Sequence, residues 1–235
     1  MSAAFRQSAV DWSAVAADLD EMSVALTGDL LSKQRCEELQ EIYRDAETFR
    51  SVVSMQRHNF GRGEYKYFTY PLPPVVQALR EHFYAQLSPL ANEWNARLGI
   101  DATWPASLQA LTEQCRAGGQ HRPTPLLLRY EKGDYNCLHQ DRYGDILFPF
   151  QVIVLLSQPG IDFSGGELVL VEQRPRMQSR PTVVALRQGQ AAIIPVRERP
   201  RPGSRGWYRT QLRHGVSRIT GGERYTLGVI FHDAA

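Results

Sequence analysis

The second half of the chain is broken into short runs rich in Val, Ile, Leu and Tyr, each bounded by Gly or Pro, from about Arg122-Pro123 onward. Several short strands at this spacing predict a sandwich or barrel rather than alternating strands and helices. We expect the Pro- and Arg-rich stretch Arg197–Gly206 to form a long loop at the rim. The predicted strands are Leu126–Glu131, Phe150–Leu156, Glu167–Glu172, Thr182–Leu186, Ala191–Val196 and Tyr225–Phe231.

The first half reads as helical, because its apolar residues recur near the spacing of one helix face. The sequence therefore divides into a helical region, residues 1–121, packed on a β domain, residues 122–235. The Gly- and Tyr-rich stretch from residue 58 to 74 is either an ordered connection, which we favour, or a lid. The expected helices are Ala14–Leu26, Leu30–Phe49, Val75–Leu87 and Leu90–Leu98, the last two separated at Ser88-Pro89.

Bulk composition is that of an ordinary globular protein, with 43% hydrophobic and 22% charged residues among 235. No apolar run approaches the ~20 residues of a membrane-spanning helix, so we expect no membrane contact. The N-terminus lacks a basic start followed by an apolar stretch, which favours a cytoplasmic location. The odd, widely spaced cysteines Cys36, Cys115 and Cys137 argue against a disulfide framework. Oligomeric state stays open.

Charge is distributed unevenly along the chain. Residues 174 to 224 contain twelve Arg and only Glu198 and Glu223 as acids, a formal charge of +10, whereas the whole chain carries +2. Such a segment can attract a polyanion. The simpler interpretation, which we favour, is a solvated Arg-rich surface.

A metal site is indicated by His139, Asp141 and the distal His214. Residues i and i+2 of an extended segment face the same side, so His139 and Asp141 can supply two ligands from one strand edge. Two imidazoles and one carboxylate leave open coordination positions, which is typical of non-haem Fe(II) oxygenases, although affinity alone does not exclude Co, Ni or Zn. The remaining histidines lack such context and are interpreted as structural or surface residues: His58, His82, His121 and His232.

A second group of residues suits an anionic co-substrate. Arg224 and Thr226 are again i and i+2, so the guanidinium and the hydroxyl can face one cavity. A buried Arg needs an anionic partner, which the far carboxylate of 2-oxoglutarate would supply. Tyr130 can add a phenolic hydrogen bond from the neighbouring strand. We expect Cys137, two residues before His139, to be a small buried apolar residue.

Four segments resemble the 2-oxoglutarate- and Fe(II)-dependent dioxygenases, particularly the prolyl 4-hydroxylase-like branch: RYEKGDYNCLHQD (129–141), FSGGELVL (163–170), GQAAIIPV (189–196) and RHGVSRITGGERYTLGVIF (213–231). The resemblance implies an α+β fold with a mainly β core, a double-stranded β-helix (jelly roll, cupin-like) with N-terminal helices packed on the major sheet. That branch often has Lys where this chain has Arg224, so proline is not implied as the target.

The resemblance also implies a site and its chemistry. Fe(II) would be held by His139, Asp141 and His214, and 2-oxoglutarate would chelate the iron with its 5-carboxylate on Arg224. Members of the family consume O2 and release succinate and CO2, and ascorbate can serve as a reductant. The protein supplies geometry and excludes water.

Three functions fit these observations. The first is hydroxylation of a peptide, a protein side chain or a small molecule, and we favour it. The second is oxidative demethylation of alkylated nucleic acid, which the +10 segment supports; Trp207-Tyr208 is the one stacking candidate for a base. The third is a non-catalytic jelly-roll module with a structural metal, which the presence of Arg224 disfavours.

Overall fold

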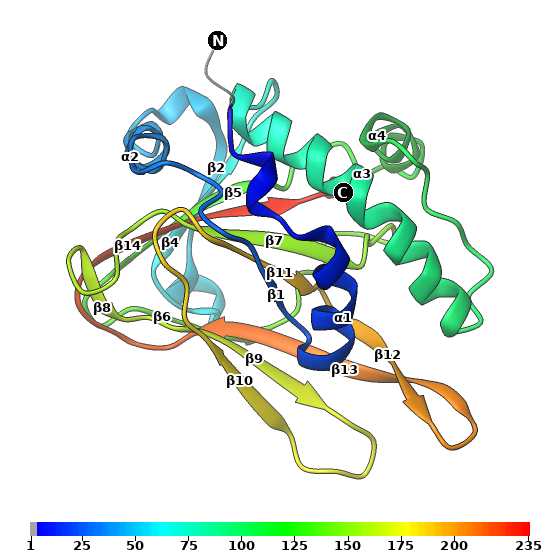
Figure 1. Ribbon diagram of the computed structural model, residues 1–235. Helices are drawn as coiled ribbons and strands as arrows, with labels where there is room; N and C mark the ends of the chain where they lie inside the picture. Colours follow the sequence, from blue (N-terminus) through cyan, green and yellow to red (C-terminus); the bar gives the residue numbers. More distant parts are fainter. Residues whose placement is uncertain (1–3) are drawn as a thin grey trace.

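Two antiparallel sheets face each other, and the helices cover the outer face of the larger one (Figure 1). The computed structural model describes residues 4–235. The major sheet runs in the order β1 (Ala25–Leu26), β11 (Ala191–Pro195), β7 (Phe150–Leu155), β14 (Ile219–Ile230), β5 (Leu126–Glu131), β4 (Glu64–Phe68) and β2 (Phe49–Ser54), with β8 (Phe163–Gly165) beside β14. The minor sheet runs β10 (Arg180–Val184), β9 (Leu168–Gln173), β13 (Gly206–Val216), β6 (Tyr135–His139) and β3 (Gly61–Arg62), with β12 (Glu198–Gly203) beside β13.

The layers follow from strands that are apolar on both faces. In β7, Val152 and Val154 belong to the core under the helices, whereas Ile153 and Leu155 belong to the core between the sheets. A strand that is buried on both faces reads as a continuous apolar run, which is how β7 and β11 appear in the sequence. This arrangement confirms the predicted jelly roll with helices packed on the major sheet. The helices are α1 (Trp12–Met22), α2 (Lys33–Ile42), α3 (Pro74–Arg97) and α4 (Leu108–Ala117), with 3₁₀ turns η1 (Gln7–Ala9), η2 (Ala46–Thr48) and η3 (Met55–His58).

Helix α3 corrects the predicted break at Ser88-Pro89, because it continues through Pro89 to Arg97. Proline inside a helix costs about 3 kcal/mol through the lost hydrogen bond and the ring clash. The flanking side chains Leu87, Leu90 and Trp94 are buried against the sheet. Burial of each large apolar side chain contributes about 1.5–3 kcal/mol, which outweighs the local penalty.

The region before residue 122 is mixed rather than helical, which corrects the prediction for residues 1–121. Strand β1 pairs with β11, β4 lies between β2 and β5, and β3 pairs with β6, so this region extends both sheets. The predicted helices end early: α1 at the left-handed Ser23, and α2 before a turn in which the Asp45 carboxylate accepts bonds from Glu47 and Thr48. Residues 1–3 of the region lie outside the described residues.

The predicted rim loop Arg197–Gly206 is a hairpin. Strands β12 and β13 pair along its length and project from the minor sheet beside the β9–β10 hairpin (Figure 1). Pro200 and Pro202 are compatible with pairing because β12 lies at an edge, where no further strand requires their missing donors.

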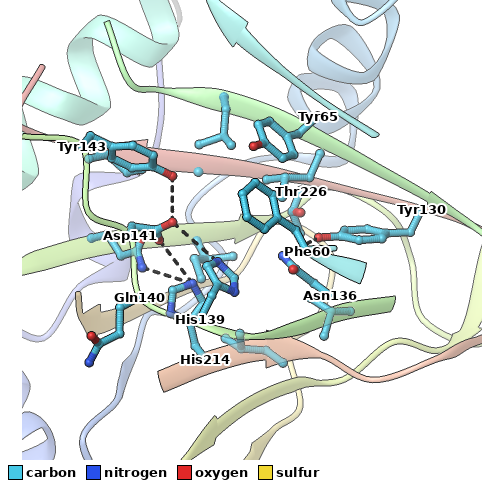
Figure 2. Close-up of a pocket in the computed structure, with 18 of the residues that line it drawn as sticks. Phe60, Tyr65, Tyr130, Asn136, His139, Gln140, Asp141, Tyr143, His214 and Thr226 are labelled. Carbon is cyan, nitrogen blue, oxygen red and sulfur yellow. Dashed lines mark hydrogen bonds and ion pairs between the residues drawn. The ribbon is translucent and has the colours of Figure 1, made fainter. Parts of the chain in front are cut away.

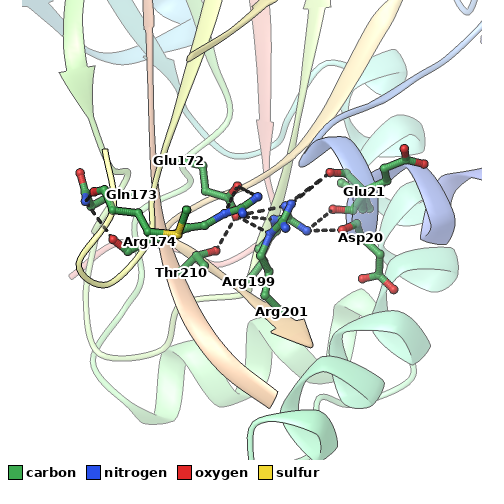
Figure 3. Close-up of polar contacts among 10 residues, drawn as sticks. Asp20, Glu21, Glu172, Gln173, Arg174, Arg199, Arg201 and Thr210 are labelled. Carbon is green, nitrogen blue, oxygen red and sulfur yellow. Dashed lines mark hydrogen bonds and ion pairs between the residues drawn. The ribbon is translucent and has the colours of Figure 1, made fainter. Parts of the chain in front are cut away.

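Most arginines of the +10 segment are exposed, as in the favoured interpretation, but Arg199 and Arg224 are buried. Glu172 accepts ion pairs from Arg199 and Arg201, each at 3.0 Å, and a 2.8 Å hydrogen bond from Thr210 (Figure 3). Arg199 is fully buried and also donates to the Asp20 main-chain carbonyl at the end of α1. These arginines fasten the β12–β13 hairpin to β9 and to α1.

No helix among residues 4–235 is long and apolar enough to cross a membrane.

Candidate metal centre and co-substrate cavity

Strand pairing brings the three predicted metal ligands together between the sheets. His214 on β13 lies directly opposite His139 at the end of β6, and Asp141 follows two residues later (Figure 2). The His139 Nε2 is 3.5 Å from Asp141 Oδ1, and the His214 Nε2 is 3.3 Å from Asp141 Oδ2. One ligand atom from each residue lies within 4.8 Å of the other two. The three predicted ligands are therefore close enough together to bind one metal ion.

The electrostatics of the triad are those of a carboxylate shared by two imidazoles. Burial opposes ionisation of Asp141, but its contacts with His139 and His214 outweigh burial and hold its pKa well below the ordinary value. Burial also works against charge on His139, yet Asp141 raises the pKa of that ring. Burial and the neighbouring His139 lower the pKa of His214. A divalent cation bound here would neutralise the buried Asp141 carboxylate.

A bulge in β6 shapes the wall beside the triad. His139 pairs with His214 and Asn136 with Val216, so β6 has one residue more than β13 over this step. A bulge breaks the alternation of side chains and is common next to active sites. Both Asn136 and His139 therefore line the cavity, and Cys137 is exposed. The prediction of a buried Cys137 was wrong for this reason.

The His139 ring is oriented for ligation. Its Nδ1 lies 2.8 Å from the main-chain oxygen of Cys137, which fixes the proton on Nδ1. The lone pair of Nε2 is then directed toward Asp141 and His214. Such an outer hydrogen bond is usual for histidine ligands and sets both tautomer and ring angle.

The other end of the cavity is formed by β14 and β5. Arg224 is opposite Tyr130 in the sheet, and both line the cavity with Thr226. The guanidinium of Arg224 is 2% exposed, and its Nε and Nη1 have no hydrogen-bond partner among the described residues. Burial lowers the pKa of Arg224 to about 10. Gly166, at φ +69°, makes room for this side chain, since a Cβ there would lie 3.0 Å from Arg224 Cδ.

The Tyr130 phenol is held in place by Asn136. The ring is fully buried, and the hydroxyl accepts a 3.3 Å hydrogen bond from Asn136 Nδ2. Burial raises the pKa of Tyr130, so the phenol keeps its proton at neutral pH and can donate it in a hydrogen bond. Tyr130, Thr226 and Arg224 thus present three donors along one wall.

Triad and guanidinium lie in a single cavity of about 220 Å³. The walls between the two ends are largely apolar, and the mouth carries Phe60, which is 46% exposed, and Arg142. Phe60 belongs to the stretch after residue 58 and contacts the ring of His58, with centroids 5.3 Å apart. The further lining residues include Leu126, Leu128, Ile153, Leu168, Val216 and Ile230.

The residues present fit a Fe(II) ion and a keto diacid. Two imidazoles and one carboxylate are the donor set that leaves positions open on such a metal. An unpaired guanidinium in a low-dielectric interior is costly, so the orphaned Nε and Nη1 of Arg224 mark a place for an anion. A carboxylate is the anion whose planar shape matches that fork.

Residues 63–234 match a family described as "Oxygenase, catalysing oxidative methylation of damaged DNA". The chain belongs to this oxygenase family. The chain is therefore an oxygenase, and its His-Asp-His triad and jelly-roll fold are those expected of the class that uses Fe(II) and 2-oxoglutarate. Two uncharacterised proteins from two strains of Mycobacterium tuberculosis are 49% identical over 168 residues, 72% of this chain and 72% of each relative.

Solved structures with the same fold include prolyl hydroxylases. A Pseudomonas putida prolyl-4-hydroxylase has a TM-score of 0.55 at 17% identity and covers 95% of this chain and 100% of that chain. A Trichoplax adhaerens prolyl hydroxylase in complex with a hypoxia inducible factor peptide fragment has a TM-score of 0.55 at 16% identity, covering 94% and 89%. A Burkholderia pseudomallei oxidoreductase of the 2OG-Fe(II) oxygenase family has a TM-score of 0.50 at 17% identity, covering 98% and 96%. At these identities the likeness concerns the fold.

The other histidines and the predicted stacking residue do not line the cavity. They are His58, His82, His121, His232 and Trp207, the last of which lies on the β12–β13 hairpin.

Several cavity residues escaped the sequence analysis, namely Phe60, Asn136, Tyr143 and Gln151. Tyr143 alone had a signal, since it lies two residues after Asp141 in the same extended stretch. Gln151 was concealed in an apolar run; its amide lies 3.3 Å from His214 Nε2.

Proposed function

We propose that His139, Asp141 and His214 are the iron ligands and that Arg224 binds the far carboxylate of 2-oxoglutarate, with Thr226 and Tyr130 alongside. The observation that carries this proposal is the presence of both groups in one cavity, the triad at one end and an unpaired guanidinium at the other. When bound, iron and keto acid supply the oxidant that inserts one oxygen atom of O2 into a substrate C–H bond, with succinate and CO2 as co-products.

The chain's own residues prepare the site for that reaction. The main-chain oxygen of Cys137 holds His139 in the ligating tautomer. Asp141 provides the negative charge that a divalent cation requires. The apolar walls, Leu126 and Ile153 among them, keep water away from the oxidant. The protonated Tyr130 phenol can donate to a carboxylate that lies against Arg224.

We further propose that the substrate is an alkylated base in DNA. The family description supports it, and so does the exposed Phe60 at the cavity mouth. A base that is turned out of the stack needs an aromatic or apolar surface beside the reacting site. Phe60 offers that surface. Trp207, the stacking residue predicted from the sequence, does not line the cavity. The exposed Arg142, which also lines the cavity, suits a phosphate beside the base.

The reaction balances without a further reagent. Hydroxylation of an N-methyl carbon gives an N-hydroxymethyl group, which loses formaldehyde and returns the proton to the base nitrogen. The four electrons that reduce O2 come from the keto acid and the methyl C–H bond, two from each.

The test is anaerobically loaded enzyme, given O2 and one of three probes: a methylated single-stranded oligonucleotide, the same oligonucleotide without methylation, and a proline-containing peptide. Formaldehyde and succinate released in equal amounts with the methylated probe alone support the proposal. Succinate with a hydroxylated peptide and no formaldehyde would refute DNA as the substrate and favour the peptide hydroxylase. No succinate in any reaction would favour the binding module.

Phe60→Ala tests the binding of the base separately from the oxidation chemistry. Stacking on an aromatic side chain contributes about 1–3 kcal/mol per base, so the variant should need about 5- to 150-fold more oligonucleotide. Trp207→Ala is the matched control, and equal losses in both variants would contradict the role of Phe60.

A further inference from the structure

Asp141 has one hydrogen-bond partner that is not itself a proposed metal ligand. The hydroxyl of Tyr143 donates to Asp141 Oδ1 at 2.7 Å (Figure 2). The other polar contacts that the described residues make with this carboxylate come from His139 and His214. A metal would occupy the imidazole nitrogens of both contacts, so the bond from Tyr143 is the one that persists in the loaded site.

We propose that Tyr143 is a positioning residue that holds Asp141 so that one oxygen, Oδ2, ligates the iron. The inference rests on the proposed function. Oδ1 accepts the bond from the phenol and is 3.5 Å from His139 Nε2, whereas Oδ2 has no bond from the phenol and is 3.3 Å from His214 Nε2. A carboxylate that ligates through one oxygen takes one coordination position. The positions that the keto acid and O2 require are then left open.

Two aromatic rings pack against the Tyr143 ring and restrict it. The Tyr67 and Tyr143 rings meet edge to face with centroids 6.0 Å apart and planes at 87°, and the centroid of the His232 ring lies 6.2 Å away. The Ala235 main-chain nitrogen donates to the Tyr143 carbonyl at 3.1 Å. Asp141 lies beyond the end of β6, so strand pairing does not fix its position. The hydrogen bond from Tyr143 then positions its carboxylate.

The neighbouring backbone reinforces the anchor. Gly144, at φ +152°, lies so close to Gln120 that a Cβ would meet the amide carbon at 2.4 Å. The Gln120 amide nitrogen donates to the main-chain oxygens of Ile146 and Asp233. The segment after Asp141 is thereby tied to the C-terminal end of the chain on one side and to α4 on the other. Outer hydrogen bonds of this kind set ligand orientation and usually change metal affinity 10–100-fold.

The experiment compares Tyr143→Phe with Tyr67→Phe in the apo-protein. Each variant loses one buried phenol oxygen in the same aromatic cluster, but only Tyr143 contacts Asp141. Affinities for Fe(II) under anaerobic conditions and for Co(II) in air should fall about 10–100-fold in Tyr143→Phe. Tyr67→Phe removes a neighbour of the Tyr143 hydroxyl but no contact with Asp141, so its loss of affinity should be clearly smaller. Melting of both apo-proteins checks that each variant is folded.

The Co(II) absorption spectrum distinguishes positioning from general support. A carboxylate freed in Tyr143→Phe can bind through both oxygens, which raises the coordination number and weakens the visible d–d bands. An unchanged affinity and spectrum in Tyr143→Phe, with metal bound by the wild type, would overturn the inference alone. Equal losses in both variants would overturn it too, since they indicate cluster packing. If the wild type and His139→Ala bind metal equally, the proposed ligand set fails and the inference with it.

Discussion

Replacement of Arg224 by Met should make the apo-protein more stable while it abolishes co-substrate binding. The side chain is 2% exposed, and its Nε and Nη1 donate no hydrogen bond to the described residues. A buried charge without a partner destabilises the folded state. Met fills a similar volume without a charge, so the substitution removes the penalty and retains most of the packing.

The size of the effect follows from the pKa of Arg224. Burial lowers it from 12.5 to about 10, which corresponds to about 3 kcal/mol against the charged form. At pH 7 the guanidinium is charged in both the folded and the unfolded chain, so the whole penalty is present. The charge of Glu167 and the rings of Tyr130 and Phe163, each 5.8 Å from the guanidinium carbon, offset part of it. The free energy of unfolding should therefore rise by about 1–3 kcal/mol.

Urea denaturation with and without 2-oxoglutarate measures both consequences. A ligand at 100 times its Kd stabilises a protein by about 2.7 kcal/mol, and the wild type should show that gain. Arg224→Met should show none. Arg224→Lys is the matched variant, because it keeps the charge but loses the fork; each hydrogen bond to a charged group contributes about 1.5–3 kcal/mol, so its affinity should fall about 10–100-fold.

Two results would refute this reasoning. If apo Arg224→Met unfolds at a clearly lower urea concentration than the wild type, the guanidinium already has a stabilising partner and does not mark an anion-binding site. If 2-oxoglutarate stabilises the variant as much as the wild type, the far carboxylate binds elsewhere.

Three further predictions concern stability and metal binding. His232 is fully buried, and burial lowers its pKa to about 4. Below about pH 6.5 the unfolded chain binds a proton at this residue and the folded chain does not, so the free energy of unfolding should fall by about 3 kcal/mol between pH 6.5 and 4. A pH series of urea denaturation curves should show a smaller loss in His232→Asn. Glu172→Gln should lower the free energy of unfolding by about 3–5 kcal/mol, because it leaves Arg199 buried without its counter-charge, whereas the more exposed Glu198→Gln should cost under about 1 kcal/mol. His214→Ala should abolish Fe(II) binding in a direct titration; retained binding would contradict the ligand set.

The strands were predictable because burial left a simple trace in the sequence. Leu126–Glu131 and the start of Ala191–Val196 match β5 and β11 at their bounds, since apolar runs between Gly and Pro mark buried strands. The break at Pro89 was wrong because a local penalty was weighed without the tertiary packing that exceeds it. Strands β3 and β4 were missed because their partners, β6 and β5, lie about seventy residues away in sequence.

The candidate site was predictable to the extent that it obeys periodicity. His139 with Asp141 and Arg224 with Thr226 follow the two-residue repeat of extended chain, and each pair lines the cavity. Asn136 could not be found in this way, because a bulge between Asn136 and His139 changes the alternation of side chains along β6. A bulge depends on the pairing of two strands, which no single run of residues specifies.

Charge counted along the sequence and charge available on the folded surface are different quantities. The +10 segment left a polyanion surface open as the alternative to a solvated face, yet Arg199 and Arg201 are bound to Glu172, and Arg224 lies inside the cavity. The nucleic-acid proposal therefore depends on the mouth of the cavity, where Phe60 and Arg142 stand beside the reacting point. The jelly roll that this chain shares with prolyl hydroxylases does not decide between the two substrates, because function depends on the site and not on the fold. Selectivity for a base over a peptide must arise from the few side chains at that opening.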